Sequence, residues 1–160
     1  MGQWIHSLED LKGIIDGERA KGKRIVFGNG CFDLLHVGHI RYLSAAKALG
    51  DILVVAVNDD ESLVSLGKRA SVITPFEERI EILAALAAVD YIIAFKEPTV
   101  ERLLRELKPH IHAKGTDYTA DTVPEREVVR AYGGEVAIVG DPKNHSTRDI
   151  IKQVRRMEPR

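Results

Sequence analysis

The stretch Gly28-Asn-Gly-Cys-Phe-Asp-Leu-Leu-His-Val-Gly-His39 decides how this chain of 160 residues folds. It follows a short β-rich run that begins at Arg24, and it leads into a helical pattern that begins near Gly38. The first N–H groups of a helix have no partner within it, and its dipole is positive at that end. The stretch therefore predicts an anion-binding turn between a strand and a helix.

Strand and helix patterns alternate along the rest of the chain. The run Asp51-Ile-Leu-Val-Val-Ala-Val57 is almost wholly apolar, which is typical of a strand buried on both faces of a parallel sheet. Further strands are expected over 91–95, 110–113 and 135–139, and helices over 8–21, 38–49, 75–88, 100–107, 124–132 and 147–157. We therefore predict an α/β fold: a doubly wound, Rossmann-like, parallel five-stranded sheet with helices on both faces.

Local signals predict how some of these helices begin and which way one of them faces. Ser7 is expected to cap the first helix, and Thr74 to cap the helix that has Pro75 at its first position. In the last helix the residues expected to face inward are Ile150, Ile151 and Val154.

Length and composition indicate one ordinary globular domain over residues 1–160, with the helix of residues 1–22 packed on it. Apolar residues make up 44% of the chain and charged residues 29%, which excludes a disordered or collagen-like protein. The net charge of -1 provides no overall basic field, so we expect neither nucleic acid nor a membrane as a partner. A single cysteine and the lack of a visible signal or membrane segment favour a cytoplasmic protein.

His36 and His39 are the strongest candidates for chemistry. They lie three positions apart at a predicted helix start, so both imidazoles are expected on one face, with Gly38 leaving room for a ligand. Together with free backbone amides they predict a polyphosphate site. A zinc centre is an alternative, but the nearby sequence offers only Asp33 as a third ligand, and that carboxylate serves equally well to orient the turn.

Two segments resemble known phosphate-binding patterns, but each departs from its pattern at a required position. Residues 17–24 resemble a P-loop, but they end in Arg24 where Ser or Thr is needed, and they precede a strand instead of following it. The pair Gly28 and Gly30 begins like a dinucleotide fingerprint, but Asp33 stands where that pattern has its third glycine.

Further candidate residues follow the other strands, at the edge of the sheet where ligands of doubly wound folds bind. Lys68, next to Arg69, and Arg79 are cations able to clamp a leaving diphosphate, although a solvated loop explains them as well. Lys114 can neutralise a phosphate, and Asp117 can accept from a base or sugar hydroxyl. Other candidates are Ser146 and Thr147 as helix caps and phosphate ligands, and Cys31 as a small buried hydrophobe.

The motif Gly30-Cys-Phe-Asp-Leu-Leu-His-Val-Gly-His39 resembles the defining motif of the cytidylyltransferase-like nucleotidyltransferases. The resemblance extends from about Arg24 to Ile151. The segments that look most similar to the adenylyltransferases that make ADP-heptose are 56–60, 75–79, 114–118 and 133–136.

This resemblance implies transfer of AMP from ATP to a sugar 1-phosphate, here heptose 1-phosphate, with release of diphosphate. Mg²⁺ would accompany the triphosphate, and relatives suggest a homodimer. The catalytic residues implied are His36, His39, Lys68 and Arg79. The nucleotide-binding residues implied are Gly30, Cys31, Phe32, Asp33, Gly38, Lys114, Gly115, Asp117, Ser146 and Thr147.

Two other interpretations stay open. The loop 67–74 lacks the Arg-Pro pair usual in the heptose enzymes, so CTP with glycerol 3-phosphate or another alcohol phosphate remains an alternative pair of substrates. A nucleotide-binding module without turnover is the other.

Overall fold

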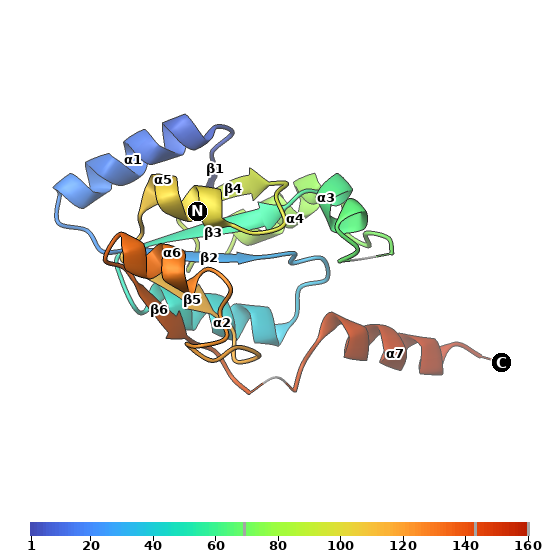
Figure 1. The fold of residues 1–160 in the computed structure, drawn as a ribbon. Helices are drawn as coiled ribbons and strands as arrows, with labels where there is room; N and C mark the ends of the chain where they lie inside the picture. Colours follow the sequence, from blue (N-terminus) through green and yellow to red (C-terminus); the bar gives the residue numbers. More distant parts are fainter. Residues whose placement is uncertain (69, 143, 160) are drawn as a thin grey trace.

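A computed structural model describes residues 1–68, 70–142 and 144–159. Its centre is one parallel sheet with the strand order β1-β4-β3-β2-β5-β6 (Figure 1). The strands are β1 (Gln3–Trp4), β2 (Ile25–Gly30), β3 (Ile52–Asn58), β4 (Tyr91–Phe95), β5 (Ile111–Lys114) and β6 (Glu135–Ile138). The predicted count of five is corrected to six, because the two-residue edge strand β1 is too short to leave a periodic pattern in the sequence.

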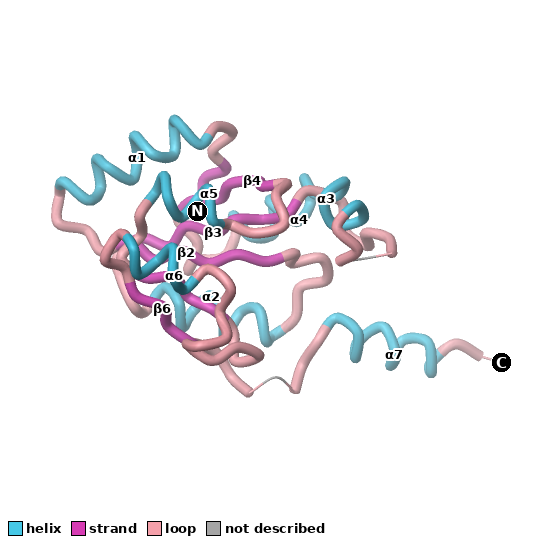
Figure 2. The backbone as a smooth tube through the Cα atoms, in the orientation of Figure 1, coloured by secondary structure: helices cyan, strands magenta, loops and turns pink. Residues whose placement is uncertain are grey.

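Helices cover both faces of the sheet, as predicted (Figure 2). One hydrophobic cluster joins the sheet to α1, α5 and α6, and a second joins its other face to α2 and α4. The helices are α1 (Leu8–Ala20), α2 (Val37–Lys47), α3 (Asp60–Ser65), α4 (Phe76–Ala84), α5 (Glu101–Leu107), α6 (Arg126–Ala131) and α7 (Thr147–Met157). Strand β3 is buried on both sides: Val54 and Ala56 face the first cluster, and Val55 and Val57 face the second.

The strand order reverses between β2 and β5. From β2 the chain crosses through α2 to β3 on one side, whereas β5, which arrives much later in the sequence, pairs with β2 on the other side. Crossovers that leave in opposite directions open a crevice beyond the carboxyl ends of the two strands. Gly30 and Lys114 are the residues that end these strands, so this crevice is where the predicted site should lie.

One predicted helix start is confirmed and another is wrong. The Ser7 hydroxyl accepts from the Asp10 amide at 3.0 Å and caps α1, as expected. Helix α4 begins at Phe76 after Pro75, without a side-chain cap. Thr74 does not cap α4, because the helix begins one residue later than predicted and Pro75, which has no side-chain acceptor, occupies the N-cap position. The Thr74 amide donates to the Asp33 carboxylate at 2.8 Å and ties this segment to the loop after β2.

The last helix does not turn its apolar side inward. Helix α7 projects from the body of the molecule (Figure 1), and within the described chain neither hydrophobic cluster includes any of its residues. Ile150 and Ile151 are half-buried, and Val154 is 54% exposed. The helical pattern was read correctly, but the sequence held no information on what the helix packs against. Within residues 1–68, 70–142 and 144–159, no helix is long and apolar enough to cross a membrane.

Candidate functional site

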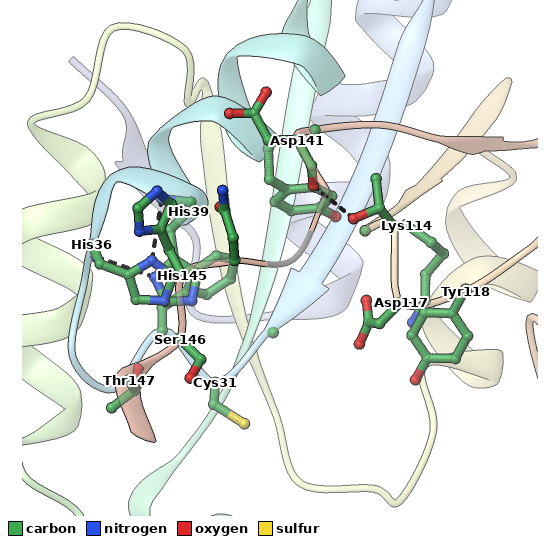
Figure 3. A pocket seen from close by; sticks show the side chains of 18 of the residues that line it. Cys31, His36, His39, Lys114, Asp117, Tyr118, Asp141, His145, Ser146 and Thr147 are labelled. Atoms are coloured by element: carbon green, nitrogen blue, oxygen red, sulfur yellow. Dashed lines mark hydrogen bonds between the residues drawn. The ribbon is translucent and has the colours of Figure 1, made fainter. Parts of the chain in front are cut away.

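A cavity of about 690 Å³ opens at the switch point, beyond the carboxyl ends of β2 and β5. Its walls come from four segments far apart in the sequence, and Figure 3 shows side chains from several of them around one hollow. The lining residues are Asn29–Phe32, His36, Gly38, His39, Tyr42, Asn58, Lys68, Lys114–Tyr118, Val139–Pro142 and Asn144–Asp149.

His36 and His39 form one wall of this cavity and also begin α2. The His36 side chain caps the helix, because its Nδ1 accepts from the Gly38 amide at 3.1 Å. A second hydrogen bond runs in the other direction: the His39 Nδ1 accepts from the His36 amide at 3.3 Å. A neutral imidazole that accepts through Nδ1 carries its proton on Nε2. The capping pair therefore gives both rings an Nε2–H donor, and the ring centres lie 4.0 Å apart (Figure 3).

Gly38 is required here for a different reason from the one predicted. A Cβ at this position would lie 2.9 Å from the His36 ring, so glycine makes room for the capping imidazole. Gly30 works in the same way: a Cβ there would meet the Phe32 ring at 3.0 Å. Phe32 adopts a positive φ of 50°, which is uncommon for a bulky residue, and its buried ring also approaches His39. Close packing thus holds the turn between β2 and α2 in shape.

Cationic side chains line the cavity from two segments. The Lys68 ammonium donates to the Asn58 Oδ1 at 3.1 Å and lies 5.5 Å from the centre of the Phe95 ring. Lys114 ends β5, and its ammonium lies 4.5 Å from the centre of the Tyr118 ring. The two ammonium groups supply the positive charge that a bound polyphosphate requires. Arg69, the neighbour of Lys68 considered in the sequence analysis, lies outside the described residues.

Lys114 is 8% exposed, and this burial lowers the pKa of its ammonium. The carboxylates of Glu125 and Asp117 oppose the shift by favouring the charged form, whereas the Lys68 ammonium adds to it. A bound phosphate would act in the same direction as the carboxylates, so anion binding and protonation of Lys114 reinforce each other.

Residues 139–142 and 144–149 form a further wall of the cavity. The Thr116 hydroxyl donates to the Asp141 carbonyl at 2.6 Å, which joins the loop after β5 to the loop after β6. Ser146 caps α7 by accepting from the Asp149 amide, as predicted. The Thr147 hydroxyl donates to the Leu34 carbonyl at 3.1 Å and fixes the start of α7 beside the start of α2.

Twelve of the fourteen predicted site residues line this one cavity. They are Gly30, Cys31, Phe32, His36, Gly38, His39, Lys68, Lys114, Gly115, Asp117, Ser146 and Thr147. The Cys31 side chain is part of the wall and lies 4.0 Å from the Asn58 Oδ1, so it is not the buried hydrophobe expected.

Arg79 is corrected from a phosphate ligand to a structural residue. Its side chain is fully buried and is not part of the cavity wall. The guanidinium donates to the carbonyls of Thr74, Cys31 and Asn58 and to the Asp60 carboxylate at 2.7 Å. A buried guanidinium engaged in this way supports the loops around the site and is not part of the surface that faces the cavity.

Asp33 is also corrected. It was expected to line the nucleotide pocket, but its carboxylate is 2% exposed and lies outside the wall of the cavity. It accepts from the amides of Ile73 and Thr74, at 3.0 and 2.8 Å, and so orders the chain that leads into α4. Of the two roles weighed for this carboxylate, orienting the turn is the one that its contacts support.

Several wall residues were missed. Asn29 and Asn58 are the clearest examples, because each lies at the carboxyl end of a strand, where a polar residue in an apolar run marks the edge of the sheet. Asn29 is held by the buried His112, whose Nε2 lies 3.1 Å from its Oδ1. Tyr42 was assigned only to a predicted helix. Its hydroxyl donates to the Ala113 carbonyl, and the residue also lines the cavity.

No group of three or more His, Cys, Asp or Glu side chains that could hold a metal ion is found in the described part of the chain. The zinc alternative therefore gains no third ligand beside His36 and His39 among these residues.

The fold and the cavity together define a class of protein. A doubly wound sheet whose switch-point cavity is walled by a helix N-terminus, paired imidazoles and two lysines is a nucleotide-binding α/β domain. Comparison with family models is more specific. The chain belongs to the cytidylyltransferase-like family, whose model matches residues 27–158, and it is a nucleotidyltransferase. The family resemblance seen in the sequence is confirmed.

Curated relatives extend the comparison. The chain is 47% identical over 152 residues to the bifunctional protein HldE of Azotobacter vinelandii, and 49% identical over 151 residues to that of Pseudomonas syringae pv. syringae. These alignments cover 95% and 94% of this chain but 32% of each relative. The chain thus spans about a third of the length of these relatives.

Two solved structures are also similar. A lipopolysaccharide core biosynthesis protein from Thermoplasma volcanium aligns with a TM-score of 0.64 and 31% identity, over 76% of this chain and 100% of its own. Pantoate-beta-alanine ligase from Francisella tularensis aligns with the same TM-score at 16% identity, over 99% of this chain and 80% of its own. The second match shows a shared fold only.

Proposed function

We propose that this nucleotidyltransferase transfers AMP from ATP to heptose 1-phosphate and releases diphosphate, giving ADP-heptose. The observation that carries the proposal is the pair of capping histidines, whose Nδ1 atoms accept backbone amides and whose side chains line one cavity together with two lysines. An oxygen of the sugar phosphate forms a bond to the α-phosphorus of ATP. The bond from that phosphorus to the bridging oxygen breaks, and diphosphate leaves with the electron pair.

This reaction needs no covalent intermediate on the protein. It needs the attacking oxygen, the phosphorus and the leaving oxygen held in line, and it needs the charge that develops on the phosphoryl oxygens to be stabilised. His36 and His39 would donate to these oxygens beside the positive end of α2. Lys68 and Lys114 would neutralise the phosphates, and the start of α7 would hold the remaining oxygens.

Mg²⁺ is proposed to enter with ATP. The cation would be held mainly by phosphate oxygens and water, as Mg²⁺ usually is when it binds a triphosphate, so it needs no all-protein cage. That requirement fits the wall of this cavity, where three carboxylates come from two of its four segments, Asp117 from one and Asp141 and Asp149 from the other. The bound cation would offset part of the phosphate charge.

The choice of heptose rests on relatives and on local sequence. The structural relative from Thermoplasma volcanium is described as a lipopolysaccharide core biosynthesis protein, and heptose is the acceptor implied by the resemblance of residues 114–118. The alternative keeps the chemistry and uses CTP with glycerol 3-phosphate or another alcohol phosphate.

The decisive experiment measures diphosphate release with Mg²⁺ for each of the four ribonucleoside triphosphates, with heptose 1-phosphate, with glycerol 3-phosphate and without acceptor. We expect release only with ATP plus heptose 1-phosphate. Release with CTP and glycerol 3-phosphate would keep the mechanism and reject the heptose. Triphosphate binding without release for any pair would favour the module without turnover.

A further inference from the structure

His112 is a buried polar residue to which the proposed reaction gives no task. It lies in β5, its ring is fully buried, and it packs edge-on against the Phe27 ring with 5.6 Å between the ring centres. Its Nε2 lies 3.1 Å from the Asn29 Oδ1, whereas its Nδ1 has no hydrogen-bond partner among the residues that the structure describes. Burying an imidazole costs free energy unless its polar atoms are satisfied, so the reason for this histidine is to be sought in its contact with Asn29.

The two strands place His112 and Asn29 on one face of the sheet. Phe27 and His112 are paired in register across β2 and β5. Side chains alternate along a strand, so Asn29 shares the face of Phe27, and Lys114 shares the face of His112. Asn29 and Lys114 therefore occupy corresponding positions near the carboxyl ends of the two strands, and both line the cavity.

The strands diverge just before these two positions. The backbone pairing of β5 with β2 ends at His112. Beyond it the Tyr42 hydroxyl donates to the Ala113 carbonyl at 2.7 Å, and a Cβ on Gly28 would lie 2.6 Å from that hydroxyl. Tyr42 thus fills the space between Gly28 and Ala113, and the side chain of Asn29 is joined to β5 by the ring of His112 instead of by the backbone ladder.

This contact also decides how the Asn29 amide is turned. Burial lowers the pKa of His112 to about 3, so the ring is neutral near pH 7 and carries one proton. With the proton on Nδ1, a buried N–H would have no acceptor, which folded proteins rarely allow. With the proton on Nε2, the ring donates to the Asn29 Oδ1. The amide oxygen of Asn29 is therefore bound on the core side, and its Nδ2 is the group left for the cavity.

We propose that the Nδ2 of Asn29 binds a phosphate oxygen of a substrate together with the Lys114 ammonium, and that His112 is the residue that positions this amide. An amide donor and an ammonium suit one phosphate group, because hydrogen bonds to charged oxygens are the strong ones. The inference rests on the proposed function, since it takes this cavity as the place of reaction. The phosphate belongs either to the triphosphate or to the acceptor, and the experiment below distinguishes the two.

The test is a double-mutant cycle. Asn29→Ala removes the donor and should weaken substrate binding about ten-fold. His112→Leu keeps an apolar side chain in the core but leaves the Asn29 Oδ1 without its donor. It should weaken the same binding about five-fold, because the amide can then turn. If His112 acts through Asn29, adding His112→Leu to Asn29→Ala costs nothing further, whereas independent effects would multiply.

Two binding measurements identify the phosphate. The Kd of a non-hydrolysable ATP analogue with Mg²⁺ reports on the triphosphate, and the KM of the phosphate acceptor in diphosphate release reports on the acceptor. A loss confined to one of them assigns Asn29 to that substrate, and kcat should stay within about two-fold of wild type. If wild type binds the analogue but turns over no acceptor, the proposed function is wrong, and the cycle measured in Kd still decides whether His112 acts through Asn29.

Two further variants separate positioning from a loss of stability. His112→Gln retains an amide N–H that can donate to the Asn29 Oδ1, so it should bring binding back to within about two-fold of wild type. Ile111→Ala is the matched control, because Ile111 precedes His112 in β5 but faces the other hydrophobic cluster. It should lower the free energy of unfolding and leave Kd and KM unchanged.

The tautomer of His112 is measured in the wild-type protein, without any substitution. Nitrogen-15 NMR of the His112 ring should show the proton on Nε2. A proton on Nδ1 would overturn the proposal, because Asn29 would then turn its Nδ2 to the ring and its oxygen to the cavity. Unchanged binding of both substrates in Asn29→Ala would overturn it as well, and so would losses that multiply in the double variant.

Discussion

Two histidines combine a structural task with a chemical one. The Nδ1 atoms of His36 and His39 accept backbone amides at the start of α2, and this fixes the proton of each ring on Nε2. The helix that the histidines cap also contributes its positive end to the same cavity. At the scale of single residues, the hydrogen bonds that begin the helix therefore also prepare the donors of the site.

His39→Ala should lower turnover on the order of 10²-fold or more, as loss of a transition-state donor does. His39→Asn separates the two tasks, because an amide oxygen can still accept from the His36 amide but supplies no Nε2–H. We expect His39→Asn to keep the thermal stability of wild type and to lose turnover like His39→Ala. Diphosphate release and thermal unfolding are the two measurements. Full turnover in His39→Ala would show that the site is assigned wrongly.

His112 makes the stability of the fold depend on pH. Its ring is fully buried against Phe27 and Asn29, and burial lowers its pKa from 6.5 to about 3. At a pH between these two pKa values, His112 binds a proton in the unfolded chain but not in the folded chain. The contribution of His112 is therefore complete above pH 6.5 and is lost as the pH falls, by about 1.4 kcal/mol per pH unit.

The check is urea unfolding at pH 7 and pH 5. Between pH 7 and pH 5 the free energy of unfolding of wild type should fall by about 2 kcal/mol more than that of His112→Asn, whose side chain cannot be protonated. His6→Gln, a substitution at an exposed histidine, serves as the control and should follow wild type. Equal losses in wild type and His112→Asn would contradict the prediction.

At the scale of elements, Arg79 connects pieces that the sequence keeps apart. From α4 its guanidinium reaches the carbonyl of Cys31 after β2, that of Asn58 at the end of β3, and the carboxylate of Asp60 in α3. Two strand ends and two helices therefore depend on one buried cation.

Arg79→Ala should lower the free energy of unfolding by about 3–5 kcal/mol, because it leaves buried acceptors without their donor. Lys96→Ala, which breaks an exposed pair with Asp59, is the control and should cost less than about 1 kcal/mol. Denaturant unfolding measures both. An Arg79→Ala protein with unchanged stability but a higher KM for the triphosphate would restore the ligand role first predicted for this residue.

At the scale of the whole molecule, the cavity is assembled from segments that begin near residues 29, 58, 114 and 139. Ligand binding should therefore couple distant parts of the chain. A non-hydrolysable ATP analogue with Mg²⁺, at 100 times its Kd, should raise the free energy of unfolding by about 2.7 kcal/mol.

Hydrogen exchange locates this coupling. Amides in 29–39, 114–118 and 140–149 should exchange more slowly with the analogue bound. Helices α1 and α5, whose residues do not line the cavity, should change only through global stability. Protection confined to a segment outside the cavity would place the nucleotide elsewhere.

The sequence by itself determined the class of fold and identified residues from distant segments that share one cavity. Periodicity alone reports which residues are apolar and how they recur, so five strands, the helices between them and the segments at the strand ends were predictable. The motif that ends at His39 added its histidines, and twelve of fourteen predicted residues share one cavity because the carboxyl ends of parallel strands meet at one edge.

Only the tertiary structure decided what each polar group contacts. Arg79 and Asp33 have the residue types of a phosphate site, yet burial and backbone partners make them supports of the loops. The stripe of α7 was read as inward because periodicity shows that a helix has an apolar face but not what covers it. That surface depends on where the chain places α7.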